Sequence, residues 1–143
     1  MRTIARSRHN PQYNETALGE GLADAGFSYQ RLQGLGGLRH TTKVSINQAW
    51  KNHSFRGYAD YMQTSEFAES LEQLMRIAET ARTVIMCAEA VPWRCHRSLI
   101  GDALVIRGVS VEDLIAVGNS KPHRLTSFAH VHGDEITYPA AAT

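Results

Sequence analysis

An apolar run followed by an amphipathic helix is the feature of this chain that most restricts its fold. Residues 83–87 (TVIMC) are continuously apolar and partly β-branched, which is typical of a strand buried on both faces of a parallel sheet. After a loop that contains Pro92, apolar residues recur at helical spacing from about Cys95 to Arg107. This order of strand and helix predicts an α/β fold: a layered, largely parallel sheet with flanking helices.

Other segments are compatible with the same architecture. Thr64 is a good N-cap for the clearest helix, whose apolar residues lie on one face. The expected helices cover about residues 15–25 and 65–80 and the end of the segment 45–62, and the expected strands cover residues 27–32 and 109–117. With 143 residues the chain is long enough for one domain, in which we expect a partly flexible tail at about residues 127–143.

The overall charge excludes a general attraction to nucleic acid or membranes. The formal net charge is +1, so any electrostatic argument must depend on local clusters of charge. No apolar run approaches the roughly 20 residues that span a bilayer, and the first residues lack the apolar core of a secretory signal. We therefore expect a cytoplasmic protein without membrane association.

The strongest local cluster lies at the start of the helix that begins near Cys95. Arg94, His96 and Arg97 supply three potential cations in four positions, whereas the dipole of a helix favours acidic residues there. Such an arrangement is favourable if an anion binds among the cations, and helix N-termini bind phosphate groups readily. The pattern predicts a site for a phosphate-bearing ligand.

The two cysteines belong to the same segment. In a chain without an export signal, Cys87 and Cys95 indicate free thiols, metal ligands or catalytic groups more than a structural disulfide, although the sequence alone leaves a bridge open. We take Cys87, Glu89 and His96 as the candidate catalytic residues. A metal site formed by Cys87, Cys95 and His96 is an alternative. A second alternative is purely structural, with Cys87 as an apolar side chain and Arg97 paired to an acidic residue.

Two further loops carry cations. Arg6, Arg8 and His9 lie in an irregular N-terminal segment. Arg39 ends a glycine-rich loop at residues 34–39, which is either a flexible connector or a loop whose backbone N–H groups approach an anion. We expect these side chains to meet Arg94 and Arg97 over one end of the sheet and to bind the substrate.

In its motifs the chain resembles the domain of unknown function 488 family, a widespread bacterial family of α/β fold. The matching segments are SRHNPQYN at 7–14, GLGGLR at 34–39, FRGYADYM at 55–62, MCAEAVPWRCHR at 86–97 and PHRLT at 122–126. The resemblance implies no particular activity. It places Arg2, Arg6, Ser7, Arg8, Tyr58, Cys87, Glu89, Cys95, His96 and Arg97 on family motif positions, and we therefore add Tyr58 to the substrate-binding candidates.

The resemblance also implies that an N-terminal unit is missing. Family members begin with a further strand and helix before the segment that corresponds to residues 7–14. A chain without this unit would expose a sheet edge or a groove, which homodimerisation could cover.

Two functions of different classes follow from these observations. The first is an enzyme acting on a phosphorylated or nucleotide-like substrate at the junction of residues 87–97. The second is a non-catalytic module that binds nucleic acid or nucleotide, with the aromatic residues at 50, 55, 58 and 61 as stacking surfaces. A metal-dependent enzyme is the third option, and the sequence indicates no particular cofactor.

Overall fold

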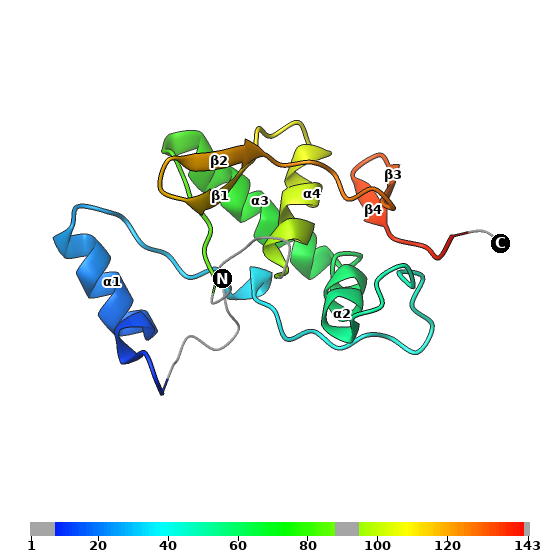
Figure 1. The fold of residues 1–143 in the computed structure, drawn as a ribbon, viewed down its shortest axis with the longest axis horizontal. Helices are drawn as coiled ribbons and strands as arrows, with labels where there is room; N and C mark the ends of the chain where they lie inside the picture. Colours follow the sequence, from blue (N-terminus) through cyan, green and yellow to red (C-terminus); the bar gives the residue numbers. More distant parts are fainter. Residues whose placement is uncertain (1–7, 88–94, 142–143) are drawn as a thin grey trace.

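Four α-helices and two β-hairpins make up the regular structure of the described residues. The computed structural model describes residues 8–87 and 95–141 (Figure 1). The helices are α1 (Glu15–Asp24), α2 (His53–Tyr61), α3 (Ser65–Thr80) and α4 (Arg97–Val105), and short 3-10 turns cover Pro11–Tyr13 and Gln33–Leu35. The strands are β1 (Glu112–Ala116), β2 (Asn119–Pro122), β3 (His130–His132) and β4 (Glu135–Thr137).

The predicted layered parallel sheet is wrong. Within the described residues, β1 pairs with β2 and β3 pairs with β4, both antiparallel, and each pair is a separate two-stranded sheet. Two residues connect the strands of each pair, and Gly118 and Gly133 adopt positive φ values of 72° and 64° in these turns. Such short connections allow only antiparallel pairing, because a parallel pair needs a crossover of a dozen or more residues.

The two strands expected before α4 do not form either. Residues 27–32 and 83–87 pair with no strand of the described chain. The side chains of Phe27 and Val84 are 64% and 68% exposed, so neither segment is buried on both faces. A short apolar run indicates that a segment tends to be buried. To form a strand, the segment also needs a neighbouring strand that pairs with its backbone N–H and C=O groups. The strand predicted at residues 109–117 is confirmed as β1, although in a hairpin.

The helix predictions are confirmed by the structure. α3 covers the predicted Ser65–Thr80, and the Thr64 side chain caps it by accepting a 3.2 Å hydrogen bond from the Phe67 N–H. The predicted helices at 15–25 and 95–107 correspond to α1 and α4, which are shorter at their ends. Local signals, an N-cap and an apolar face, were sufficient for these elements.

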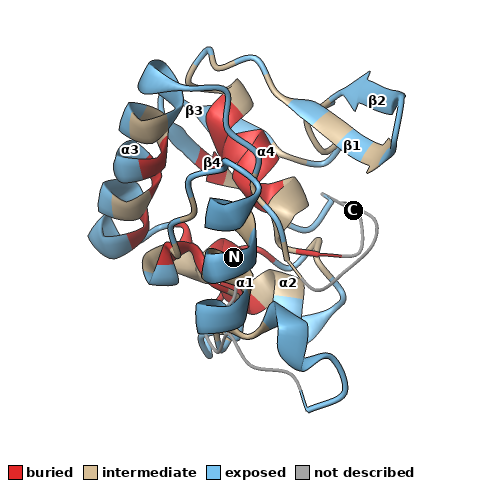
Figure 2. Cartoon of the chain, turned by 90° about the vertical axis from the view of Figure 1, so that its left-hand side faces the viewer, coloured by how far each residue is buried: buried red, intermediate tan, exposed pale blue. Residues whose placement is uncertain are grey.

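The core lies between the helices rather than on a sheet. Figure 2 shows the buried residues of α3 on the side that faces α4, and most of α4 itself buried. Tyr58 of α2 belongs to the same cluster. The C-terminal segment adds Ile136 and Tyr138, which are 3% and 0% exposed. The core therefore joins residues from Leu32 to Tyr138.

A buried carboxylate connects α4 to this C-terminal segment. Asp102 is fully buried and accepts hydrogen bonds from His123 Nε2 at 2.8 Å, the Thr126 N–H at 3.1 Å, the Thr126 hydroxyl at 2.6 Å and the Tyr138 hydroxyl at 2.8 Å. Buried charge is tolerated when it is hydrogen-bonded in this way. Asp102 thus fixes α4 relative to both the segment after β2 and the segment after β4.

His123 bridges Asp102 to a second carboxylate. Its Nδ1 lies 3.1 Å from both carboxylate oxygens of Asp113 in β1, and its side chain is 5% exposed. The hydrogen bond with Asp102 raises the pKa of His123, burial opposes this, and Asp113 adds to the increase. The imidazole packs closely on α4, since a Cβ atom at Gly101 would lie 2.8 Å from it.

The raised pKa of His123 predicts a pH-dependent stability. The stabilising charge is fully present below the unfolded value of about 6.5 and is lost as the pH rises through the folded pKa. We expect the free energy of unfolding, measured by urea denaturation, to fall over this range in the wild type. This decrease in the free energy of unfolding should be smaller in His123→Gln than in the wild type. It should equal the wild-type decrease in His9→Gln, which alters an exposed histidine. Parallel pH curves for the wild type and His123→Gln would contradict the role of this charge.

Candidate functional site

The start of α4 brings the two cysteine sulfur atoms together. Cys87 Sγ and Cys95 Sγ lie 2.9 Å apart, so one thiol donates a hydrogen bond to the other. No disulfide joins the two cysteines. Cys87 is partly exposed, whereas Cys95 is 5% exposed. The two predicted reactive residues therefore form one pair with an inner and an outer member.

Arg97 contacts the inner member of the pair twice. Its backbone N–H and its Nε–H both donate to Cys95 Sγ, each at 3.1 Å. The first N–H groups of a helix have no acceptor within the helix, and here the sulfur atom supplies one. The next N–H groups are also engaged, because Ser98 donates to the Cys95 carbonyl and Leu99 to the His96 carbonyl. The sulfur of Cys95 thus accepts one of the N–H groups at the helix start that the sequence linked to a substrate anion.

The electrostatics of the pair favour a proton on Cys95 and a charge on Arg97. The hydrogen bond with Cys87 and burial raise the pKa of the Cys95 thiol, and the two contacts from Arg97 only partly oppose this. Burial would lower the pKa of the Arg97 guanidinium, but its contacts with Cys95 and Cys87 outweigh burial and raise it. Cys95 can therefore donate its S–H to Cys87 beside a permanent positive charge.

His96 lies between the helix start and the glycine-rich loop. The centroids of the His96 and Tyr58 rings are 4.8 Å apart and the rings are tilted by 45°. A Cβ atom at Gly37 would lie 3.2 Å from His96 Nδ1, so this loop approaches the imidazole closely because position 37 has no side chain. The loop that the sequence linked to anion binding is thus part of the site's surroundings.

Two tyrosines of α2 hold that loop in place. Tyr58 donates its hydroxyl to the Leu35 carbonyl at 2.9 Å, and Tyr61 donates to the Gly34 carbonyl at 2.6 Å. The guanidinium of Arg39 lies 3.8 Å above the Tyr61 ring, and its Nε donates to the Gly36 carbonyl at 3.2 Å. Tyr58, predicted to bind substrate, is 1% exposed, so in this structure it supports the loop from inside.

Arg39 and Cys95 act electrostatically on the same phenol. Burial raises the pKa of Tyr58, as do Tyr61 and Cys95, while Arg39 lowers it. Arg97 contacts Cys95 directly, whereas Arg39 is joined to the glycine-rich loop, whose Gly37 packs on His96. In the sequence, only the family motif positions of Tyr58, Cys95 and Arg97 linked these residues. Their contacts could not be predicted, because they depend on the fold.

For the other predicted site residues, the described structure shows no contact with the start of α4. Arg6, Glu89 and Arg94 lie outside the described residues. Arg8 and His9 are exposed, and their segment leads into α1 at the left of Figure 1, whereas α4 lies near its centre. The convergence of the first loop with the start of α4 stays a prediction.

A metal site formed by Cys87, Cys95 and His96 finds no support in the geometry. Across residues 8–87 and 95–141, no three or more histidine, cysteine or acidic side chains are grouped so that they could hold a metal ion. The cysteines instead contact each other and Arg97, and His96 packs on Tyr58.

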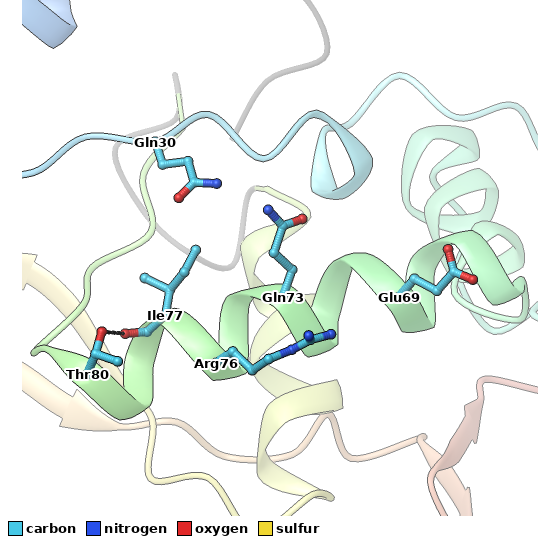
Figure 3. A pocket seen from close by; sticks show the side chains of 6 residues that line it. All are labelled: Gln30, Glu69, Gln73, Arg76, Ile77 and Thr80. Carbon is cyan, nitrogen blue, oxygen red and sulfur yellow. Dashed lines mark hydrogen bonds between the residues drawn. The ribbon is translucent and has the colours of Figure 1, made fainter.

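A hollow of about 600 Å³ lies elsewhere, between α3 and the extended segment that carries Gln30 (Figure 3). Its lining residues are mostly polar and include none of the predicted site residues: Gln30, Glu69, Gln73, Arg76, Ile77 and Thr80. It is wide open to solvent, and among the described residues that line it Arg76, whose side chain is 69% exposed, is the single cation. We prefer the start of α4 as the candidate site because reactive and charged groups converge there.

Comparison with known protein families identifies a match. A family model described as domain of unknown function DUF488 matches residues 1–104 of the 143-residue chain. The chain belongs to the DUF488 family. The DUF488 match ends inside α4, so both cysteines, His96 and Arg97 lie within it, whereas His123 and Tyr138 lie beyond it. Neither a curated protein nor a solved structure matched the chain. Within the described part of this DUF488 protein, no helix has the length and apolar character needed to cross a bilayer.

The support that Tyr58 gives to the loop can be tested by removing its hydroxyl. Tyr58→Phe leaves the buried Leu35 carbonyl without this donor, which costs about 1–3 kcal/mol. We expect the free energy of unfolding from urea denaturation to fall by that amount. Tyr13→Phe, which removes a hydroxyl from a side chain that is 53% exposed, should have almost no effect. Equal stability of the two variants would show that the Tyr58 hydroxyl does not hold the loop.

Proposed function

We propose that the protein is an enzyme that binds a phosphate-bearing, nucleotide-like substrate at the start of α4. Arg97 and Arg39 bind the anion in this proposal, and Cys87 is the reacting group. The observation that carries the proposal is the pair of 3.1 Å hydrogen bonds from Arg97 to Cys95 Sγ, which places a charged guanidinium against a cysteine pair. Sites that combine a thiol with an arginine at a helix start stabilise negative charge.

The cation cluster supports an anionic substrate. The Arg97 guanidinium is half-buried and its pKa is raised by the cysteines, so it keeps its charge where water screens it less. Guanidinium groups present planar N–H donors that match the oxygens of phosphate. Arg39 is held over Tyr61 and donates to the Gly36 carbonyl, in the loop whose Gly37 packs on His96. Arg94, next to the site in sequence, is proposed as a third phosphate ligand.

The cysteine pair supports a catalytic role for Cys87. It is the more accessible of the two thiols, and both the Cys95 S–H and Arg97 would stabilise its thiolate. His96 adjoins Cys95 in the chain and is the proposed acid or base, with Glu89 as a second candidate for that role. A thiolate close to a bound phosphate ester is positioned for nucleophilic chemistry.

The aromatic residues give less support to a nucleic-acid-binding module. Trp50 packs against Phe55 and Phe128, with ring centroids 4.9 Å apart in each pair. Tyr58 and Tyr61 pack against each other and against Phe67. Stacking on unpaired bases needs exposed ring faces. These rings stabilise the core instead, which favours a small-molecule substrate.

Calorimetric titration with three probes tests the proposal: inorganic phosphate, a nucleoside monophosphate and the matching nucleoside. We expect the nucleoside monophosphate to bind more tightly than phosphate, and the nucleoside to bind weakly. Arg97→Ala should weaken binding of the monophosphate by about tenfold or more, because a hydrogen bond to a charged group contributes about 1.5–3 kcal/mol.

Arg76→Ala is the matched control, since it removes the same charge from the hollow on α3. Its affinity should equal that of the wild type. Undiminished binding in Arg97→Ala would contradict the proposal, and a loss confined to Arg76→Ala would assign the ligand to the hollow instead.

A further inference from the structure

The two cysteines are arranged to form a covalent bond as well as a hydrogen bond. Their sulfur atoms are 2.9 Å apart, and a disulfide of about 2.05 Å requires an approach of about 0.9 Å. One sulfur belongs to Cys87 and the other to Cys95, two residues before α4 begins. Folding has therefore already brought the thiols together, so closing the bond costs little additional chain entropy.

We propose that Cys87 and Cys95 form a reversible disulfide on reaction with a hydroperoxide, which makes the start of α4 a two-electron redox site. This inference goes beyond the proposed function and does not depend on it. The substrate class is a small peroxide, and the protein's reducing equivalents come from the two thiols themselves.

The environments of the two thiols assign them different roles. Cys87 is the outer thiol and meets the peroxide first, whereas Cys95 is 5% exposed. The thiolate of Cys87 is stabilised by the S–H of Cys95 and by the charge of Arg97, and the thiolate is the form that reacts. Cys95 then acts as the resolving thiol because no other cysteine is present in the chain.

The chemistry balances in two steps. With hydrogen peroxide, the Cys87 thiolate attacks one oxygen, the O–O bond breaks, and the departing hydroxide takes a proton from solvent to become water, which leaves a sulfenic acid on Cys87. An alkyl hydroperoxide releases an alcohol in place of this water. The sulfur of Cys95 then attacks that of Cys87, so an S–S bond forms and the S–O bond breaks. The second hydroxide takes the Cys95 proton and leaves as water. Two electrons pass from the thiols to the peroxide, and a dithiol reductant reverses the change.

The test uses the full chain, reduced and then treated with hydrogen peroxide at near-equimolar concentration. Free thiols are counted with a maleimide reagent in denaturant, before and after dithiothreitol. We expect the count to fall from two per chain to zero and to return to two on reduction. Trypsin cleaves after Arg82, Arg94 and Arg97, so the two cysteines separate into peptides 83–94 and 95–97. A non-reducing digest should contain these peptides as one cross-linked species from monomeric protein.

Two matched variants assign the roles. In Cys95→Ser the oxidised Cys87 has no resolving thiol, so dimedone should trap a sulfenic acid in peptide 83–94. In Cys87→Ser the remaining thiol is buried, and it should survive the same treatment. Folding of both variants is checked by circular dichroism, and the wild-type thiol count decides the proposal if a variant is unfolded.

Three results would overturn the inference. The first is survival of both wild-type thiols. The second is irreversible oxidation of Cys87 with Cys95 still free, and the third is disulfides between chains rather than within one. A failure of phosphate binding would leave the thiol count unchanged, so the two proposals can fail separately.

Discussion

The buried carboxylate of Asp102 is the constraint on which the arrangement of α4 depends. It lies in the middle of the helix and accepts hydrogen bonds from three residues of the C-terminal segment, His123, Thr126 and Tyr138. Removing any one donor would leave the buried carboxylate with fewer hydrogen bonds, which would destabilise the folded protein. The same helix begins with Arg97, so the network that fixes its middle also fixes the direction in which its first turn meets the cysteines.

The helical part of the fold was predictable because its signals are local. Thr64 and the apolar residues of α3 are close in sequence, and the cap and the buried face appear as expected. The parallel sheet was wrongly predicted, because local signals do not determine which strands pair with one another. The run at residues 83–87 has the composition of a buried strand, yet Val84 is exposed and the segment pairs with no described strand. The hydrogen bonds of Asp102 could not be predicted either, because the sequence does not indicate which donors lie close to a given carboxylate.

The candidate site was found from the sequence for the same reason that the helices were. Cys87, Cys95, His96 and Arg97 are near one another in the chain, and the structure keeps the cysteines and Arg97 in contact. The sequence did not show that Cys95 would accept the first N–H of α4, nor that Gly37 would pack on His96. Both facts depend on backbone placement. Arg39 joined the site's surroundings through the tyrosines of α2, which a motif alone does not reveal.

The influence of Arg97 on the cysteine pair links the anion site to the thiol chemistry, and it can be measured directly. The rate of alkylation of Cys87 by iodoacetamide, followed in tryptic peptide 83–94, reports its thiolate as a function of pH. In Arg97→Ala the midpoint of this rate profile should move to higher pH, because the positive charge beside the sulfur atoms is gone. Arg97→Lys, which keeps a charge without the planar N–H donors, should lie between the two. Superimposable profiles for the wild type and Arg97→Ala would show that Arg97 does not stabilise the thiolate.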